Sequence, residues 1–223
     1  GATGSGGKDS TSGGGTMNSG GSNGSGGDAS GGGVGFAPCP TTEACRILPL
    51  GDSITFGLGA SGGYRVQLFS RALADGKNIT FVGSQSNGPD NVAGSSFPKN
   101  HDGYSGYTIQ QIADLIPDQL APEPHIVLLH LGTNDMYLSP SGATERLGSL
   151  IDEITTQLPE SLVVVSSIVP FPAQASAVDT YNATLPGLVE SRQSAGAHVL
   201  FVDQFENFPT DELGDGVHPD QDG

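Results

Sequence analysis

The sequence of 223 residues predicts an α/β fold, in which helices cover both faces of a parallel β-sheet. Two observations predict this fold class. Short, almost continuously apolar segments alternate with longer segments of helical periodicity, which is typical of buried parallel strands joined by helices. A glycine or a proline follows most of the apolar segments, which indicates that each one is a separate strand.

Five strands and four helices are expected in alternating order. The strands are predicted at residues 46–50, 78–82, 125–131, 162–169 and 198–202. The helices are predicted at residues 63–75, 108–120, 143–158 and 179–195. Proline should end or kink the second helix at Pro117 and interrupt the fourth near Pro186. Residues 83–106, between the second strand and the second helix, are rich in Gly, Ser, Asn and Pro. This composition predicts a long loop of the kind that is usually functional.

The first 36 residues have a different composition from the rest. They hold 16 of the 35 glycines, and the only apolar residues up to Gly33 are Ala2, Met17 and Ala29. Such a segment buries too little apolar surface to offset the entropy of ordering it, so we expect a disordered Gly/Ser-rich linker. The folded domain is expected at residues 37–223, and we expect a monomer.

The charge of the chain argues against several classes of partner. Lys and Arg number 8 against 24 Asp and Glu, a formal net charge of −16. Without a basic cluster, nucleic-acid binding is not expected, and anionic membranes would repel the chain. No apolar run is long enough to span a membrane. A neutral or weakly charged substrate is favoured.

Two cysteines lie six residues apart, at Cys39 and Cys45. They are either a disulfide, which would imply an oxidising compartment, or two free thiols, and they make a poor zinc site. A tail rich in Gly, Ser and Asn before a domain is common in secreted or lipid-anchored enzymes. We therefore expect a secreted or cell-surface protein, with its signal peptide or lipid anchor outside this chain.

Four polar motifs follow the predicted strands. They are Gly51-Asp52-Ser53, Gly83-Ser84-Gln85, Gly132-Thr133-Asn134-Asp135 and, beyond the last strand, Asp215-Gly216-Val217-His218. Because the carboxyl ends of parallel strands share one edge of a sheet, these motifs should converge there. Together they offer a hydroxyl, a backbone N–H, a side-chain amide and an Asp/His pair.

This set of groups is suited to acyl transfer. Ser53 would be the nucleophile, His218 would take its proton, and Asp215 would hold the imidazole in the correct tautomer. The backbone N–H groups of Ser53 and Gly83 and the side-chain amide of Asn134 would bind the oxyanion of the tetrahedral intermediate. The chemistry needs no metal or cofactor.

With these motifs in this order, the sequence resembles the SGNH (GDSL) hydrolases, which are esterases with a flavodoxin-like, three-layer α/β/α fold. The blocks of the family fall on residues 51–55, Gly83, residues 132–135 and residues 215–219, nearly the whole length of the predicted domain. The resemblance implies the same nucleophile, base, acid and oxyanion-binding groups that the chemistry assigns.

Within that family, residues 101–108 (HDGYSGYT) resemble the acetylxylan esterases of carbohydrate esterase family 3. The stretch at residues 81–85 (FVGSQ) agrees with this. The resemblance implies a substrate that is an acetylated polysaccharide, such as acetylxylan, or a small ester. The candidates for contacts with the sugar are His101, Asp102, Tyr104 and Tyr107.

The chain departs from the family pattern at its end. Gly223 follows His218 by five residues, whereas family members continue into a C-terminal helix that packs on the sheet. We therefore expect a C-terminally truncated domain. Part of the apolar face near the first strands should be exposed, and the loop that bears His218 should lack its anchor.

Three other functions fit parts of the sequence. A lipase, lysophospholipase or thioesterase of the same family would act on longer acyl chains or on thioesters. Residues 57–62 (GLGASG) fit the dinucleotide fingerprint of an oxidoreductase, but the strand before them already ends at Gly51. A non-catalytic carbohydrate-binding protein would not need the complete set of catalytic groups.

The remaining titratable residues are expected to be structural. His125, His130 and His198 lie in or beside predicted strands, where a histidine is more often a hydrogen-bonded core or edge residue than a catalytic one. Asp135 is expected to bond nearby backbone amides.

Overall fold

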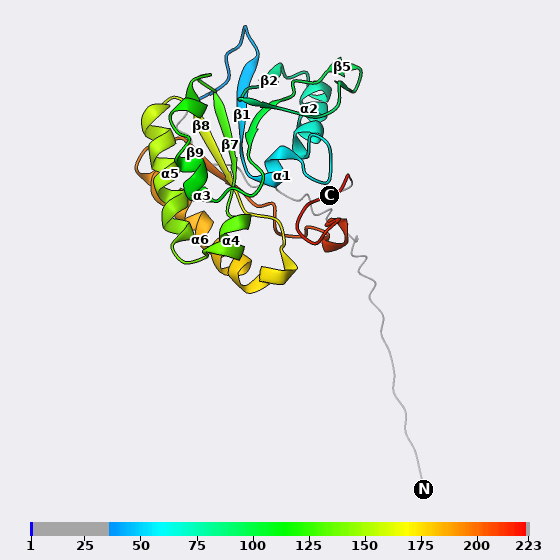
Figure 1. Cartoon of the computed structure of the whole chain (residues 1–223), viewed down its shortest axis with the longest axis vertical. Helices are drawn as coiled ribbons and strands as arrows, with labels where there is room; N and C mark the ends of the chain where they lie inside the picture. Colours follow the sequence, from blue (N-terminus) through cyan, green and yellow to red (C-terminus); the bar gives the residue numbers. More distant parts are fainter. Residues whose placement is uncertain (2–35, 222–223) are drawn as a thin grey trace. The chain divides into compact units, whose positions relative to one another are not determined.

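The structure is a computed structural model that describes residue 1 and residues 36–221 (Figure 1). All the helices and strands described below lie within residues 31–223, which form one compact unit. Nearly all of the predicted linker, residues 1–36, lies outside the described residues.

Five parallel strands form the centre of the sheet, which confirms the predicted fold class. They are β1 (Cys45–Gly51), β2 (Ile79–Phe81), β7 (Ile126–His130), β8 (Leu162–Ser166) and β9 (Val199–Val202). β1 pairs with β2 on one side and with β7 on the other, and β8 and β9 continue the sheet beyond β7. The carboxyl ends of these strands therefore share one edge (Figure 1).

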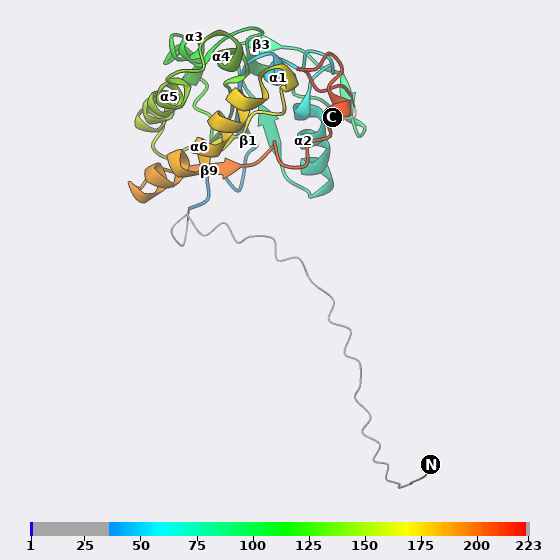
Figure 2. The same cartoon turned by 90° about the horizontal axis from the view of Figure 1, so that it is seen from below.

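Helices cover both faces of the sheet, as predicted. α3 (Ile109–Ala113), α5 (Ala143–Gln157) and α6 (Ala175–Ser194) lie on one face, and α2 (Tyr64–Ala74) lies on the other (Figures 1 and 2). Two short helices, α1 (Ser53–Phe56) and α4 (Thr133–Leu138), begin directly after β1 and β7. Both short helices stand at the carboxyl edge of the sheet.

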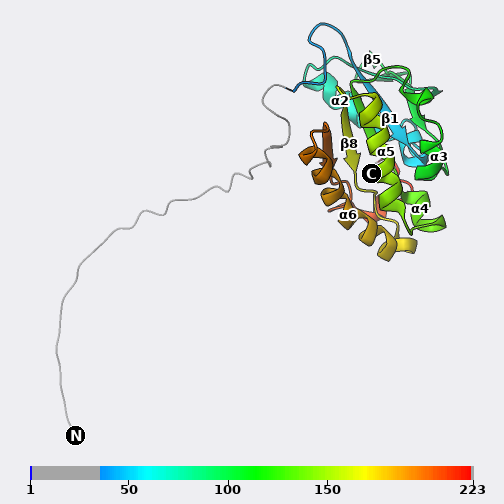
Figure 3. The ribbon, with the colours of Figure 1, turned by 90° about the vertical axis from the view of Figure 1, so that its left-hand side faces the viewer.

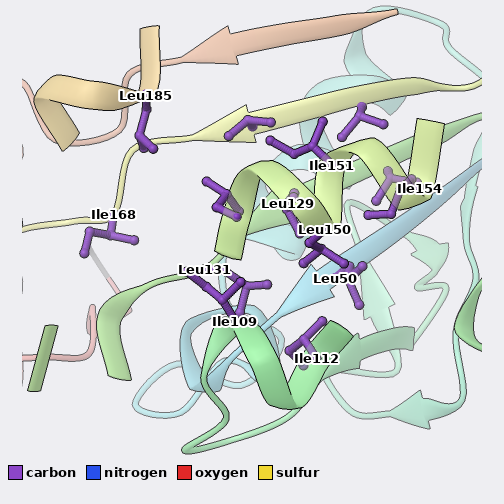
Figure 4. Close-up of a cluster of buried hydrophobic side chains, with 14 of the residues drawn as sticks. Leu50, Ile109, Ile112, Leu129, Leu131, Leu150, Ile151, Ile154, Ile168 and Leu185 are labelled. Carbon is purple, nitrogen blue, oxygen red and sulfur yellow. The ribbon is translucent and has the colours of Figure 1, made fainter. Parts of the chain in front are cut away.

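The larger part of the core lies under α3, α5 and α6. Leu129 of β7, Ile151 of α5 and Ile109 of α3 are fully buried in this cluster (Figure 4). On the opposite face, Ile126 and Leu128 of β7 are only half-buried. The half-buried strand residues continue on β8 and β9, whereas Cys45, Ile47 and Phe81 of β1 and β2 are buried on that face, in a cluster with Phe69 of α2. The prediction of an exposed face near the first strands is therefore wrong in its location.

The two prolines behave differently. α3 ends at Ala113, and a separate turn of 3-10 helix, η1 (Asp118–Leu120), follows Pro117, which confirms the predicted break. α6 instead runs without interruption through Pro186, contrary to the prediction. Buried residues before and after Pro186, including Val178 and Val189, hold α6 on the core, so tertiary packing outweighs the lost hydrogen bond.

Residues 83–106 are not a plain loop. They contain four short strands, namely β3 (Gln85–Ser86), β4 (Asn91–Val92), β5 (Ser95–Ser96) and β6 (Asn100–Gly103). β6 pairs in parallel with the end of β1 and antiparallel with β3, which extends the sheet to seven strands. Arg65 organises this segment, because its fully buried guanidinium donates to the carbonyl oxygens of Asn87 and Lys99.

Cys39 and Cys45 form a disulfide at the start of β1, which decides between the two alternatives that the sequence left open. Within residues 36–221, no helix is both long and apolar enough to cross a membrane.

Candidate active site

Ser53 lies in a tight turn between β1 and α1. Asp52 caps α1, since its Oδ1 accepts from the N–H of Ile54 at 3.0 Å. Glycine is required at Gly51, because a Cβ there would lie 2.3 Å from Thr55 Oγ1 and 2.5 Å from the carbonyl oxygen of His130. The turn thus places Ser53 at the carboxyl edge of the sheet, with 5% of its surface exposed.

Three side chains that were predicted together form a continuous relay. Ser53 Oγ lies 2.8 Å from His218 Nε2, and His218 Nδ1 lies 2.8 Å from Asp215 Oδ2. Asp215 Oδ1 also accepts from the backbone N–H groups of Val217 and His218. The hydrogen bond from the imidazole, helped by these N–H groups, lowers the pKa of Asp215 to about 2. An ionised carboxylate, an imidazole and a hydroxyl in this geometry can generate a serine nucleophile.

The loop that carries Asp215 and His218 has an anchor, contrary to the prediction. Leu213 and Pro219 form a β-bridge, and the N–H of Gly214 donates to the carbonyl oxygen of His218 at 3.0 Å. Leu213, which follows the 3-10 turn η3 (Thr210–Glu212), is buried in a small cluster with Ile54 and Val169. The loop is therefore tied to α1, the same helix that begins at Ser53.

Asn134 lies at the start of α4, in the turn after β7. Gly132 has φ +126° and lies under the ring of Tyr181, where a Cβ would come within 2.6 Å of the ring. The Tyr181 hydroxyl donates to the carbonyl oxygen of Leu131 at 2.9 Å. Asn134 Nδ2 donates to the carbonyl oxygen of Tyr107 at 2.9 Å. This bond uses one of the two amide protons, so the second proton is left for an oxyanion.

Asp135 is structural, as predicted, and the structure adds a partner that sequence reasoning missed. Its Oδ2 accepts from the backbone N–H of Ile109 at 2.9 Å. Its Oδ1 lies 2.8 Å from Arg146 Nη2 on α5, and its side chain is 1% exposed. Because Asp135 follows Asn134 directly, this buried ion pair fixes the turn that presents the Asn134 amide.

Gly83 is not placed next to the residues with which it was predicted to act. A Cβ at Gly83 would lie 2.4 Å from the carbonyl carbon of His101, so a close approach to β6 explains this glycine. β6 lies between β1 and β3, and only one residue separates Gly83 from the start of β3. The Gly83 N–H is therefore one strand away from the turn that carries Ser53.

Gly106 occupies the position beside Asn134 instead. The N–H of Tyr104 donates to the carbonyl oxygen of Gly51, and the carbonyl oxygen of Tyr107 accepts from Asn134. Gly106 lies between these two attachments, with φ +84° and no atom within 4 Å of the place of a Cβ. Its N–H has no acceptor among the described residues. The sequence indicated this role only weakly, by a glycine at position 106, two residues before the helix predicted at residues 108–120.

The four predicted sugar-binding residues do not form one exposed surface. His101 and Asp102 are fully buried in β6, where Asp102 Oδ1 accepts from the N–H and the hydroxyl of Ser84. Burial, with Arg65 nearby, lowers the pKa of His101 to about 4, and burial raises the pKa of Asp102. Tyr104 and Tyr107 are half-buried and stack on each other, with 5.2 Å between ring centroids.

A buried polar cluster that was not predicted lies beneath Ser53. Both ring nitrogens of His130 are buried without a hydrogen-bond partner among the described residues, and Asp52 Oδ2 and Thr133 Oγ1 are buried as well. Burial raises the pKa of Asp52 and lowers the pKa of His130, although the attraction between the two opposes both shifts. The expectation that His130 is hydrogen-bonded is therefore wrong.

The other two predicted structural histidines have partners. His125 Nδ1 accepts from the N–H of Arg46 at 2.9 Å, and the ring of His198 stacks on Phe36.

The glycine run at residues 57–62 does not directly follow a strand, as the dinucleotide fingerprint requires. It follows α1, and a Cβ at Gly59 would lie 2.8 Å from the carbonyl oxygen of Pro219. The run therefore contacts the loop that bears His218, which removes the support for a dinucleotide site.

Comparison with known proteins agrees with this geometry. The model of the GDSL-like lipase/acylhydrolase family matches residues 50–223. The structure is similar to that of a family 3 carbohydrate esterase of Clostridium thermocellum. The sequence identity is 36% and the TM-score is 0.74, over 81% of this chain and 90% of that one.

Two further similarities were found. A solved mutant acetyl esterase with an acetate ion is 26% identical, with a TM-score of 0.65 over 79% of this chain and 89% of that chain. A multidomain esterase of Ruminococcus flavefaciens is 30% identical over 208 residues, which are 80% of this chain but 27% of that protein. The chain thus spans about a quarter of the length of this curated relative.

Proposed function

Because this chain belongs to the GDSL-like lipase/acylhydrolase family, and is therefore an esterase, we propose that it removes acetyl groups from xylan or a related plant polysaccharide. The observation that carries the proposal is the unbroken relay from Ser53 through His218 to Asp215, with 2.8 Å at both hydrogen bonds. This relay supports a Ser-His-Asp acyl-enzyme mechanism.

In the first half of the proposed reaction, the acetyl group moves from the sugar to Ser53. Ser53 Oγ attacks the carbonyl carbon while His218 Nε2 takes the hydroxyl proton. When the tetrahedral intermediate collapses, the bond between the carbonyl carbon and the sugar oxygen breaks. His218 then gives its proton to that oxygen, so the sugar leaves as an alcohol.

In the second half, water takes the place of the sugar. His218 removes a proton from the water, the resulting hydroxide attacks the acetyl carbonyl, and His218 returns the proton to Ser53 Oγ as the acyl bond breaks. The product leaves as acetic acid, which loses its remaining proton to the solvent as acetate, and the relay is restored. Asp215 stays ionised throughout and stabilises the imidazolium in both halves.

Three donors are proposed for the oxyanion: the N–H of Ser53, the free amide proton of Asn134 and the N–H of Gly106. We assign the third donor to Gly106 rather than to Gly83, because Gly106 lies between the segments bonded to Gly51 and to Asn134. Each such donor typically supplies about 3–4 kcal/mol of transition-state stabilisation.

The choice of an acetyl ester on a carbohydrate has support from two sides. The two solved structures to which the chain is similar are named as a carbohydrate esterase and as an acetyl esterase with acetate. The net charge of −16 favours a neutral polymer over an anionic one. The disulfide between Cys39 and Cys45 supports secretion into an oxidising compartment.

A second candidate is an esterase for longer acyl chains. Three large apolar side chains, Leu58, Tyr137 and Leu138, are 45%, 67% and 62% exposed. Tyr137 and Leu138 lie on α4, one turn after Asn134, where an acyl chain could contact them.

Initial rates on p-nitrophenyl acetate, butyrate and octanoate, together with acetate release from acetylated xylan, test the two candidates. Fast cleavage of the acetate ester with release from xylan is expected. A preference for octanoate without release from xylan would replace the proposal with the second candidate.

The Ser53→Ala variant is the control for mechanism. It should lose turnover on every ester while keeping its thermal midpoint, because only the hydroxyl is removed. Activity near that of the wild type would overturn the assignment of Ser53 as the nucleophile.

A further inference from the structure

We propose that a groove between α4, the start of α5 and the first half of α6 is a subsite for neutral sugar residues of the polysaccharide, outside the catalytic centre. This inference rests on the proposed function and extends it from the ester bond to the chain that carries it.

The groove has a volume of about 570 Å³. Met136 of α4 and Pro140 line one side, and residues from Ala173 to Thr184 line the other, including the end of the 3-10 turn η2 (Pro172–Gln174). Figure 3 shows α4 and α6 on the same side of the molecule, near the carboxyl edge of the sheet. This volume is within the range of small-molecule sites in proteins.

The chemistry of the lining favours a polyhydroxylated ligand. Besides Tyr181, whose hydroxyl donates to the carbonyl oxygen of Leu131, six of the lining residues carry a hydroxyl or an amide on an uncharged side chain: Ser141, Thr144, Gln174, Ser176, Thr180 and Thr184. Uncharged groups that both donate and accept hydrogen bonds match the hydroxyl groups of a neutral sugar.

The absence of charge in this lining is informative because the chain itself is strongly acidic. The formal net charge is −16, yet none of the described residues that line the groove is charged. A cationic ligand would find no carboxylate there, and an anionic ligand would find neither Lys nor Arg. A neutral ligand is the one that these residues fit.

Three threonine hydroxyl groups of the groove can act only as hydrogen-bond acceptors toward a ligand. Thr184 Oγ1 donates to the carbonyl oxygen of Tyr181 at 2.7 Å, so Thr144 must donate in the 2.8 Å bond between Thr144 and Thr184. Thr180 Oγ1 likewise donates to the carbonyl oxygen of Ser176 at 2.8 Å. The protons of these three hydroxyls are used within the protein, and their free lone pairs can accept from sugar hydroxyls.

The other three polar side chains of the groove are available in both roles. Ser141, Gln174 and Ser176 have no side-chain hydrogen-bond partner among the described residues. The groove thus combines three hydroxyl groups that can only accept hydrogen bonds with three side chains that can donate or accept. This combination would let it hold a sugar in a preferred orientation.

The groove is connected to the catalytic centre through shared elements. Met136 lines the groove two residues after Asn134 on the same short helix. Tyr181 lines the groove and also holds the turn before Asn134, through its bond to the carbonyl oxygen of Leu131. The proposal places a polysaccharide chain, with its acetyl group at Ser53, across α4 and into the groove.

An exposed aromatic ring adds an independent observation. Tyr137 is 67% exposed at the rim of the groove: it directly follows Met136 and precedes Pro140 by three residues, and those two residues line the groove. An exposed tyrosine offers an apolar face with a polar tip, which suits the mixed apolar and polar faces of a sugar ring.

Filling the groove tests the inference. Ser176 and Thr180 are exposed on α6, so Ser176→Trp and Thr180→Trp should fold while occupying the space. The KM for acetylated xylo-oligosaccharides should rise about tenfold in both variants, which corresponds to about 1.4 kcal/mol of binding. The kcat/KM for p-nitrophenyl acetate, which is too small to reach the groove, should not change.

The matched control is Ser194→Trp. Ser194 is exposed on the last turn of the same helix and does not line the groove. This variant adds the same ring to α6 and should leave both substrates unaffected. Thr180→Val, which removes one hydroxyl at constant shape, should raise the KM for the oligosaccharide by a smaller factor.

Binding without turnover separates this inference from the proposed function. Titration calorimetry of unacetylated xylo-oligosaccharide into Ser53→Ala should show affinity that falls about tenfold when Ser176→Trp is added. Unchanged affinity and unchanged KM in both groove-filling variants would overturn the subsite. A wild-type protein that cleaves no acetate ester would overturn the proposed function instead, and the calorimetry would still decide the role of the groove.

Discussion

The two turns that meet Ser53 are held in place in different ways. The turn after β7 is held by tertiary contacts from two helices, with Tyr181 of α6 bonded to Leu131 and Arg146 of α5 bonded to the buried Asp135. The loop at residues 213–219 is held largely by bonds within itself and by one small apolar cluster. The side chain of Asp215 is 59% exposed, whereas that of Asp135 is 1% exposed.

The difference follows from what each turn has to do. Stabilising an oxyanion requires dipoles that already point at the developing charge, so the role proposed for Asn134 needs a turn that is fixed before reaction. Acid–base catalysis requires an imidazole that exchanges protons with several partners in turn. A locally closed loop, with Asp215 and His218 three residues apart, is sufficient to keep those two groups together.

Removing the base from the locally held loop should have the largest effect. In His218→Ala, kcat on p-nitrophenyl acetate should fall by about 10⁴–10⁶, because Ser53 then has no group to take its proton. The thermal midpoint should change little, since His218 bonds mainly within its loop. Steady-state rates and a calorimetric melt measure the two quantities. A large loss of stability would contradict the comparison between the turns.

Breaking the ion pair between Arg146 and Asp135, which supports the turn of Asn134, should lower the stability of the fold. Arg146→Met leaves Asp135 buried without its cation, and the free energy of unfolding should fall by about 3–5 kcal/mol. Urea denaturation measures this loss. Arg71→Met, at an exposed arginine of α2, is the matched control and should change the free energy of unfolding little. Equal effects in the two variants would mean that the buried pair does not hold the turn.

Removing the amide from the tertiary-held turn should cost less activity than removing the base. Asn134→Ala should lower kcat by about 10²–10³, with KM nearly unchanged, because the amide binds the oxyanion of the transition state rather than the ground state. Kinetics on p-nitrophenyl acetate separate the two constants. If KM rose while kcat stayed constant, Asn134 would be a substrate-binding residue instead.

The smallest effect concerns pH. The pKa of Asp215 is lowered from its usual 3.8 to about 2, so its stabilising contribution is fully present above 3.8 and is lost as the pH falls through about 2. An NMR titration of the carboxyl carbon should give a midpoint near the lower value. In His218→Ala the midpoint should rise, since the imidazole is the first cause of the shift. A wild-type midpoint at the usual value would contradict the relay.

The strands and the catalytic relay could be predicted because their signals are local. Apolar runs such as residues 162–166 mark buried strands by themselves, and Ser53, Asn134 and His218 follow strands whose order fixes a common edge. The oxyanion-binding role that we propose for Gly106 could not be predicted in the same way. It depends on a backbone N–H whose direction is set by the bonds of Tyr104 and Tyr107 to two other turns.

The burial of two ionisable side chains in β6 could not be predicted from the sequence either. His101 and Asp102 are adjacent polar residues in a segment rich in turn formers, a pattern that indicates a solvated loop. The structure buries both because Arg65 and Ser84, distant in sequence from them, supply hydrogen bonds and charge that make β6 possible. Periodicity within one segment holds no information about such partners.

The disulfide and the nucleophile Ser53 lie at opposite ends of β1. Cys45, in the disulfide with Cys39, is its first residue, and Gly51, next to the turn of Ser53, is its last. A strand of seven residues spans roughly 20 Å, so the sulfur atoms lie far from the reacting hydroxyl. A reductant would therefore lower the free energy of unfolding, by about 2 kcal/mol of chain entropy, and leave the turnover of each folded molecule as it was.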